Sequence, residues 1–121
     1  MRITFCALLV AGALGITGAS TATAQDRTGY QAIKQGDFST AERILMAQRR
    51  IHPERPELMI NLAAVHSRAG RTDEARSLYE AVLARPNLLM DVTADHTAWS
   101  HDLAAAGLRR LSGTGAKFSS R

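Results

Sequence analysis

The sequence contains few of the residues on which thiol chemistry and aromatic recognition depend. Among 121 residues there is one cysteine, Cys6, and aromatic residues make up 5% of the chain. A single cysteine excludes a scaffold held together by disulfides within the chain. Apolar residues at 45% and charged residues at 21% exclude wholesale disorder and a collagen-like chain. The length allows one small domain, which excludes an enzyme with separate cofactor and substrate domains.

Sequence motifs typical of enzymes are also lacking. The chain has no Gly-x-Ser-x-Gly nucleophile elbow, no phosphate-binding glycine loop and no His-Glu-x-x-His zinc motif. Carboxylate pairs such as Asp73 and Glu74 fall at predicted helix starts, where the helix dipole accounts for them. We therefore expect a protein that is not an enzyme and that needs no cofactor.

Residues 1–24 have the three-part layout of a secretory signal peptide. Arg2 precedes a long apolar stretch, and Ala22 and Ala24 place small residues where signal peptidase requires them. This layout predicts cleavage between Ala24 and Gln25, and export of the protein to the periplasm or out of the cell. The mature chain would then contain no cysteine, so its stability would come from packing alone.

An uncleaved N-terminus is the competing interpretation. The stretch from Ile3 to Gln25 carries no charge and approaches the length of a bilayer span. Gly12, Gly15 and Gly18 dilute its second half, which favours cleavage. The alternative is a membrane-tethered adaptor, in which this segment would be the only contact with a membrane.

A register of 34 residues repeats in the middle of the chain. The aligned pairs are Gly36 with Gly70, Ala41 with Ala75, Ile44 with Leu78, and Leu45 with Tyr79. Each glycine is expected to close one helix, and the helix that follows has apolar residues at helical spacing. The predicted helices are 27–35, 39–51, 56–69 and 72–85, which make two helical hairpins side by side.

Capping residues predict where the second helix of each hairpin begins. Ser39 is expected to cap the helix 39–51, with Glu42 reaching back to complete a capping box. Thr72 is expected to cap the equivalent helix of the second hairpin, with acidic residues in its first turn.

Residues 56–79 resemble the tetratricopeptide repeat, a family of 34-residue helix-turn-helix units. The segment Asn61-Leu62-Ala63 matches the family's Asn-Leu-Gly/Ala core, Gly70 its turn, Ala75 its small helix-contact position and Tyr79 its aromatic position. The resemblance extends over residues 27–87, as repeats 27–53 and 54–87. With the export signal, the chain resembles a small exported bacterial member of this family. The resemblance implies a scaffold for contacts between proteins.

Two repeats leave the last helix uncovered, and the C-terminal segment is expected to cover it. Alternating apolar residues predict a short β-hairpin over 88–99, followed by a helix over 101–111 that Ser100 caps. Residues 88–111 would form this cap, and 112–121, rich in glycine and serine, a flexible tail. The predicted fold is mainly α: two stacked tetratricopeptide-repeat hairpins, an α-solenoid, capped by a β-hairpin and a C-terminal helix.

In the tetratricopeptide family the first helix of each hairpin lines a concave groove, and the resemblance implies a groove for a partner here. The register places Tyr30, Ile33 and Lys34 in it beside Ala64, Ser67 and Arg68, and Asn61 matches a family position that can bond the backbone of a ligand. The Asn61 amide would bond either a ligand backbone or a group of its own repeat. The expected partner is an unidentified protein or peptide; an exported, mildly basic chain has little access to nucleic acid. Apolar faces at the ends of the stack also allow a homo-oligomer.

One local cluster could carry chemistry of another class. It consists of Asp95, His96, His101 and Asp102, whose oxygens and nitrogens suit zinc or a similar ion. Their spacing matches no compact ligand motif, and Asp102 is well placed to stabilise a helix start. We therefore predict no metal site, and keep a small metal-dependent or acid–base enzyme using these residues as the alternative function.

Overall fold

The computed structural model describes residues 28–93 and 95–119. The elements in chain order are α1 (Tyr30–Lys34), α2 (Phe38–Ile51), α3 (Pro56–Arg68), α4 (Thr72–Leu83), β1 (Leu89–Thr93), β2 (His96–Trp99) and α5 (Ser100–Ser119). The predicted fold class, mainly α with packed helical hairpins and a short β-hairpin, is confirmed. The predicted signal peptide and its cleavage site at Ala24 and Gln25 lie outside the described residues. In the part of the chain that is described, no helix is both long and apolar enough to cross a membrane.

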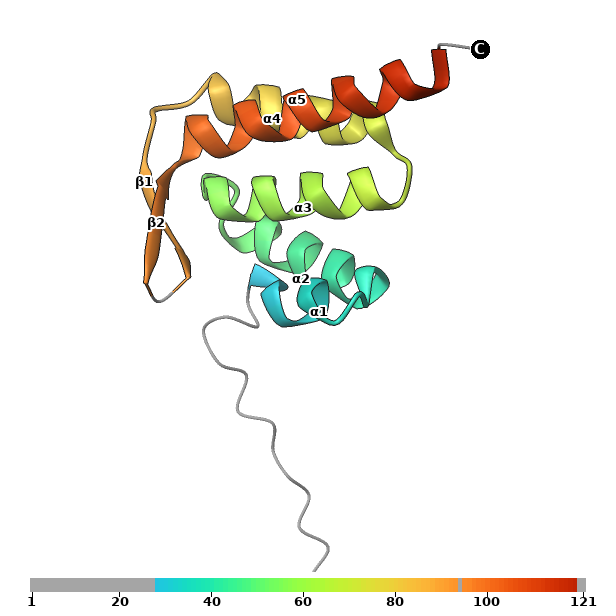
Figure 1. The fold of residues 1–121 in the computed structure, drawn as a ribbon. Coiled ribbons are helices and arrows are strands. Elements are labelled where there is room, and N and C mark those ends of the chain that lie inside the picture. Colours follow the sequence, from blue (N-terminus) through green and yellow to red (C-terminus); the bar gives the residue numbers. More distant parts are fainter. Residues whose placement is uncertain (1–27, 94, 120–121) are drawn as a thin grey trace, which may run out of the picture.

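The helices stack in chain order (Figure 1). α1 and α2 lie at one end, α3 lies in the middle, and α4 and α5 lie at the other end. The two strands form a hairpin at one side of the stack, near the first residues of α3 and α5. The β-hairpin therefore adds a wall to one side of an otherwise helical stack.

Two glycines make the turns inside the helical hairpins. Gly36 and Gly70 have φ angles of 76° and 77°, in the left-handed region that glycine adopts without steric cost. The repeated glycine of the 34-residue register thus repeats one backbone conformation.

The caps of α2 and α4 differ from the prediction. α2 begins at Phe38, and its cap is Asp37, whose Oδ1 accepts a hydrogen bond of 3.1 Å from the backbone N–H of Thr40. The capping box of Ser39 with Glu42 is therefore wrong, because Asp37 follows the Gly36 turn directly and is an equally strong cap. α4 begins at Thr72 as predicted, but its cap position is Arg71, so the prediction that Thr72 caps this helix is wrong.

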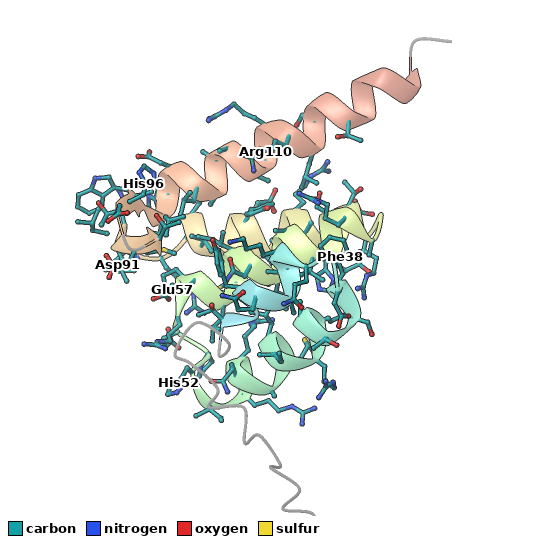
Figure 2. All side chains as sticks on the ribbon, turned by 60° about the horizontal axis from the view of Figure 1, so that its bottom comes forward. Phe38, His52, Glu57, Asp91, His96 and Arg110 are labelled. Carbon is teal, nitrogen blue, oxygen red and sulfur yellow. The ribbon has the colours of Figure 1, made fainter. Side chains whose placement is uncertain are left out.

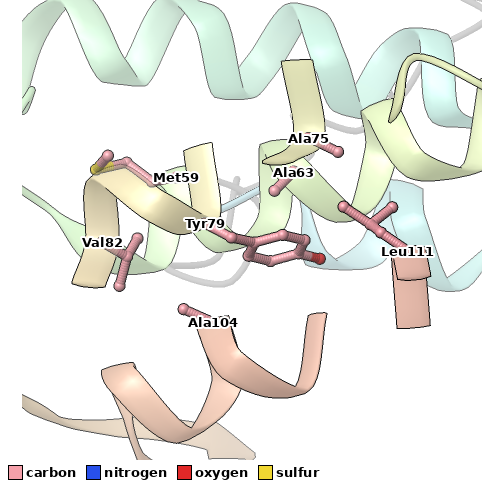
Figure 3. Packing of buried hydrophobic residues seen from close by; sticks show 7 residues of the cluster. All are labelled: Met59, Ala63, Ala75, Tyr79, Val82, Ala104 and Leu111. Carbon is pink, nitrogen blue, oxygen red and sulfur yellow. The ribbon is translucent and has the colours of Figure 1, made fainter. Parts of the chain in front are cut away.

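α3 buries two faces and so joins two apolar clusters. The cluster shared with α1 and α2 consists of Ala32, Ala41, Leu45, Leu58, Leu62 and Val65. The cluster shared with α4 and α5 consists of Met59, Ala63, Ala75, Tyr79, Val82, Ala104 and Leu111 (Figure 3). A helix that is apolar on two sides needs cover on both. α5 completes the second cover by contributing Ala104 and Leu111.

The last helix is longer than the sequence predicted. α5 continues from Ser100 through Ser119 instead of ending at 111, so most of the segment 112–121 that was expected to be a flexible tail is helical. The hydroxyls of Ser112 and Thr114 donate to the carbonyls of Leu108 and Arg110, four residues earlier, at 3.1 Å and 3.0 Å. These hydroxyls bond along the helix instead of forming a turn, which is why turn composition misled the prediction. At the other end of the chain, α1 covers only 30–34 of the predicted 27–35.

The β-hairpin is fastened at its base to the start of α5. Leu89 pairs with Trp99 and Met90 with Ala98 in an antiparallel register. Ser100 is fully buried: its Oγ accepts from the Leu88 N–H at 3.0 Å, and its own N–H donates to the Leu88 carbonyl at 2.8 Å. The predicted capping role of Ser100 belongs instead to Asn87, whose Oδ1 accepts from the His101 N–H at 3.0 Å.

Candidate functional site

A cleft of about 600 Å³ lies between the repeat helices and the β-hairpin. Its lining residues come from α3, α5 and β1, and from the chain around the start of α1. They are Thr28, Tyr30, Glu57, Ile60, Asn61, Met90, Asp91, Val92, Thr93 and Leu103. A concave, largely apolar cleft with a few polar groups is the usual form of a binding site.

Two of the seven predicted groove residues, Tyr30 and Asn61, line this cleft. Ile33 packs instead against the cluster between α1, α2 and α3, and the Arg68 guanidinium lies 5.6 Å from the centre of the Phe38 ring. The other three, Lys34, Ala64 and Ser67, are at least partly exposed and lie outside the cleft lining. The structure thus brings two of the seven into one cleft, and their role in binding stays a prediction.

Asn61 holds the chain that enters α1. Its Nδ2 donates to the Thr28 carbonyl at 3.0 Å, across 33 positions of sequence. The Asn61 amide was expected to bond either a ligand backbone or a group of its own repeat. The structure shows a bond within the protein, but the acceptor, Thr28, belongs to the preceding repeat. The bond fixes one edge of the cleft.

The cleft has an acidic character that sequence reasoning missed. Glu57 lies in the first turn of α3 and Asp91 lies on β1 (Figure 2), and among the described residues that line the cleft there is no lysine or arginine. The Oε2 atom of Glu57 is shielded from solvent and has no hydrogen-bond partner in the described part of the chain. Its place at a helix start stabilises the negative charge, but it does not supply the missing hydrogen bond. One of the residues that line the cleft therefore has a shielded carboxylate oxygen that lacks a donor.

The position of the hairpin is what the sequence did not reveal. Alternation of apolar residues predicted the strands, but not that β1 would face α3. Met90, Asp91 and Ile60 consequently carried no signal as site residues, since each is ordinary within its own element.

A cluster of polar side chains, Arg71, Glu42 and His66, lies away from the cleft and joins the two repeats. Arg71 donates two hydrogen bonds to Glu42 of α2, Nη1 to Oε1 at 2.9 Å and Nη2 to Oε2 at 2.7 Å. The hydrogen bond from Arg71 lowers the pKa of Glu42. Beside this pair His66 is buried, and burial, with the nearby charge of Arg71, lowers the pKa of its ring. This group holds the helices together and does not face the cleft.

The cluster proposed as an alternative catalytic or metal site is not assembled. Over residues 28–93 and 95–119, no three His, Cys, Asp or Glu side chains are placed to hold one metal ion. The ring Nε2 of His101 contacts the Arg85 carbonyl at 2.7 Å, and Asp102 lies in the first turn of α5. Asp95 and His96 are exposed at the tip of the hairpin. The geometry gives these residues structural roles or leaves them in solvent.

Comparison with known proteins agrees with the helical register. Residues 32–87 match a family model described as tetratricopeptide repeat. No curated protein and no solved structure gives a significant match.

Proposed function

Since residues 32–87 of this chain belong to the tetratricopeptide repeat family, we propose that the protein is a protein–protein interaction module that holds an extended segment of its partner in the cleft. The observation that carries the proposal is the cleft itself, which lies between helices of both repeats and the β-hairpin. A segment bound there would touch both repeats and the cap at once.

The construction of the cleft supports this role. Its walls belong to packed elements: α3 is buried on two faces, and the hairpin is fastened to α5 through Ser100. Rigid walls lower the ordering cost of binding, because few groups must be immobilised when the partner arrives. The lining combines apolar residues with two carboxylates, as expected for a site that recognises a peptide by shape and charge.

Site-specific photo-crosslinking tests the proposal. A photoreactive amino acid replaces Val92, which is at the cleft, or in the control protein Ile51, which is exposed at the end of α2 and outside the cleft lining. We expect a partner crosslinked from position 92 in the producing cells and none from position 51. Adding the substitution Tyr30→Ser to the Val92 protein should weaken that crosslink. Equal crosslinking from both positions would contradict the proposal.

We further propose that the module acts after export. The support is the layout of residues 1–24, with small residues before Gln25. N-terminal sequencing of the protein recovered from its producing cells should begin at Gln25. A sequence that begins at Met1 would favour the membrane-tethered adaptor instead.

A further inference from the structure

We propose that the cleft receives a basic side chain, lysine or arginine, carried by an extended partner segment that pairs with the free edge of β1. This inference rests on the proposed function and specifies the chemistry of the partner. Two independent observations carry it: the position of β1 along the cleft, and the charge of the cleft.

β1, and not β2, lies along the cleft. Successive residues of a regular strand point to opposite faces, but the register between β1 and β2 shifts between Asp91 and Thr93, so alternation does not decide which side of β1 meets the cleft. Here four consecutive residues of β1, from Met90 to Thr93, line the cleft, and no residue of β2 does. β2 occupies one edge of β1.

The other edge of β1 is available for pairing. The sheet has two strands, and no hydrogen bond joins residues 90–93 to any part of the described chain other than β2. An open strand edge is a template for a further strand. An extended peptide that adds to such an edge gains its affinity from backbone hydrogen bonds and its specificity from pockets for alternate side chains.

The charge of the cleft selects which side chain enters. Glu57, one of whose carboxylate oxygens is shielded and lacks a donor, and Asp91 on the strand itself are both among the lining residues, and no lysine or arginine is among the described residues that line the cleft. A carboxylate removed from solvent is stabilised most by a charged donor, such as an ammonium or a guanidinium. An acidic partner side chain would be repelled by the same two groups.

The apolar lining suits the rest of a basic side chain. Ile60 and Leu103 come from α3 and α5 and lie beside the carboxylates in the same cleft. Lysine and arginine pack their methylene stems on apolar surface while the charged end reaches a partner. The combination of apolar walls and carboxylates therefore matches these two side chains better than a wholly apolar or a neutral polar one.

Peptide binding to the full-length protein tests the inference. The probe is a capped seven-residue peptide of alternating valine and threonine with arginine at its centre, measured by fluorescence anisotropy. Comparison peptides carry glutamine or glutamate at the centre, or keep the arginine but have N-methylated backbone amides. We expect about tenfold weaker binding with glutamine, since a hydrogen bond to a charged group is lost. The glutamate and N-methylated peptides should bind more weakly than the arginine peptide.

Two matched protein variants locate the effect. Glu57→Gln should reduce the preference of the protein for the arginine peptide over the glutamine peptide. Adding Asp91→Asn to this variant should reduce that preference further. Glu74→Gln is the control, because Glu74 is also a first-turn glutamate but lies at the start of α4, outside the cleft. Amide hydrogen exchange adds a readout specific to strand pairing: the arginine peptide should slow exchange of amides in residues 90–93.

The outcomes separate this inference from the proposed function. Equal binding of the arginine and glutamine peptides, an unchanged preference in Glu57→Gln, or unchanged exchange in β1 overturns the inference. If a partner is nevertheless crosslinked from position 92, the proposed function stands without it. If position 92 crosslinks nothing and no peptide binds, both fail.

Discussion

Gly107 of α5 lies directly against the ring of Tyr79 in α4, so that a Cβ added at Gly107 would overlap the ring carbons. Tyr79 is buried in the cluster that α5 completes, and burial raises the pKa of its phenol. The aromatic position of the second repeat is therefore covered by a helix that follows the repeats. The close approach requires a residue without a side chain at that point of α5.

Replacing this glycine should loosen the cap. Gly107→Ala gains about 1 kcal/mol of helix propensity, but the added methyl group must displace the Tyr79 ring within a packed core. Overpacking of this kind costs about 1–3 kcal/mol, so we expect a net loss of stability in urea unfolding.

Gly113 of the same helix is the matched control. A Cβ at Gly113 would meet no atom within 4 Å, so Gly113→Ala should leave stability unchanged or raise it. If both alanine variants behave alike, the contact between Gly107 and Tyr79 does not limit the packing of α5.

Mild acid should weaken the fold through His66. Because its pKa is lower in the folded protein than its ordinary 6.5, the unfolded chain takes up the proton first as pH falls. The stability that His66 contributes is present above that ordinary value and is lost as pH falls toward the folded pKa. We expect a smaller free energy of unfolding at about pH 5.5 than at about pH 7.5.

Variants at two histidines assign this pH dependence. His66→Phe keeps an aromatic ring at the buried position and should reduce the difference between the two pH values. His52→Phe, at an exposed position after α2, should retain it. A wild-type dependence that survives in His66→Phe would assign the effect to other groups.

The ion pair between the repeats should show measurable coupling. The bidentate Arg71–Glu42 pair is partly shielded, with side chains 39% and 31% exposed, whereas in the single-bonded Arg85–Glu54 pair Glu54 is 84% exposed. A double-mutant cycle of Arg71→Gln and Glu42→Gln should give the larger coupling, since exposed pairs contribute little. The stability that the Arg71–Glu42 pair contributes is present above the ordinary carboxyl pKa of 4.5 and is lost as pH falls through the lowered pKa of Glu42. Equal coupling in the two pairs would be contrary to this expectation.

The base of the hairpin depends on one hydroxyl. Ser100→Ala removes the acceptor for the Leu88 N–H, and an unpaired buried donor costs about 1–3 kcal/mol. We expect faster amide hydrogen exchange at Leu88 and in β1, and weaker crosslinking from position 92 because that wall of the cleft loosens. Thr97→Ala, an exposed change on β2, is the control and should leave exchange at Leu88 as it is. Unchanged exchange in Ser100→Ala would mean that the remaining backbone bond suffices.

Much of the helical stack could be predicted because its signals are local. Gly36 and Gly70 mark turns through their own backbone conformation, and Ala41 and Ala75 lie at the same place in two helices. Capping was predicted less well, because Asp37 and Ser39 are both good caps and only the path of the turn decides between them. The end of α5 was missed for a related reason, since a hydroxyl such as that of Ser112 bonds equally well within a helix or a turn.

The candidate site was predicted in part. Tyr30 and Asn61 were predicted because the tetratricopeptide resemblance places them on first helices, which line the groove in that family. The 34-residue register does not decide which residues reach the cleft, because Ala64, the equivalent of Tyr30, lies outside its lining. Glu57 and Asp91 were missed, because they belong to distant elements, α3 and β1, that line one cleft only in the folded chain.

The sequence by itself determined the repeat, its turns and the apolar faces of its helices, because each depends on residues within a few positions of one another. Tertiary structure alone decided that Gly107 of α5 packs against Tyr79, and that β1 and Glu57 line the same cleft. These contacts join distant segments, and they depend on how buried surfaces and hydrogen bonds are satisfied together across the whole fold.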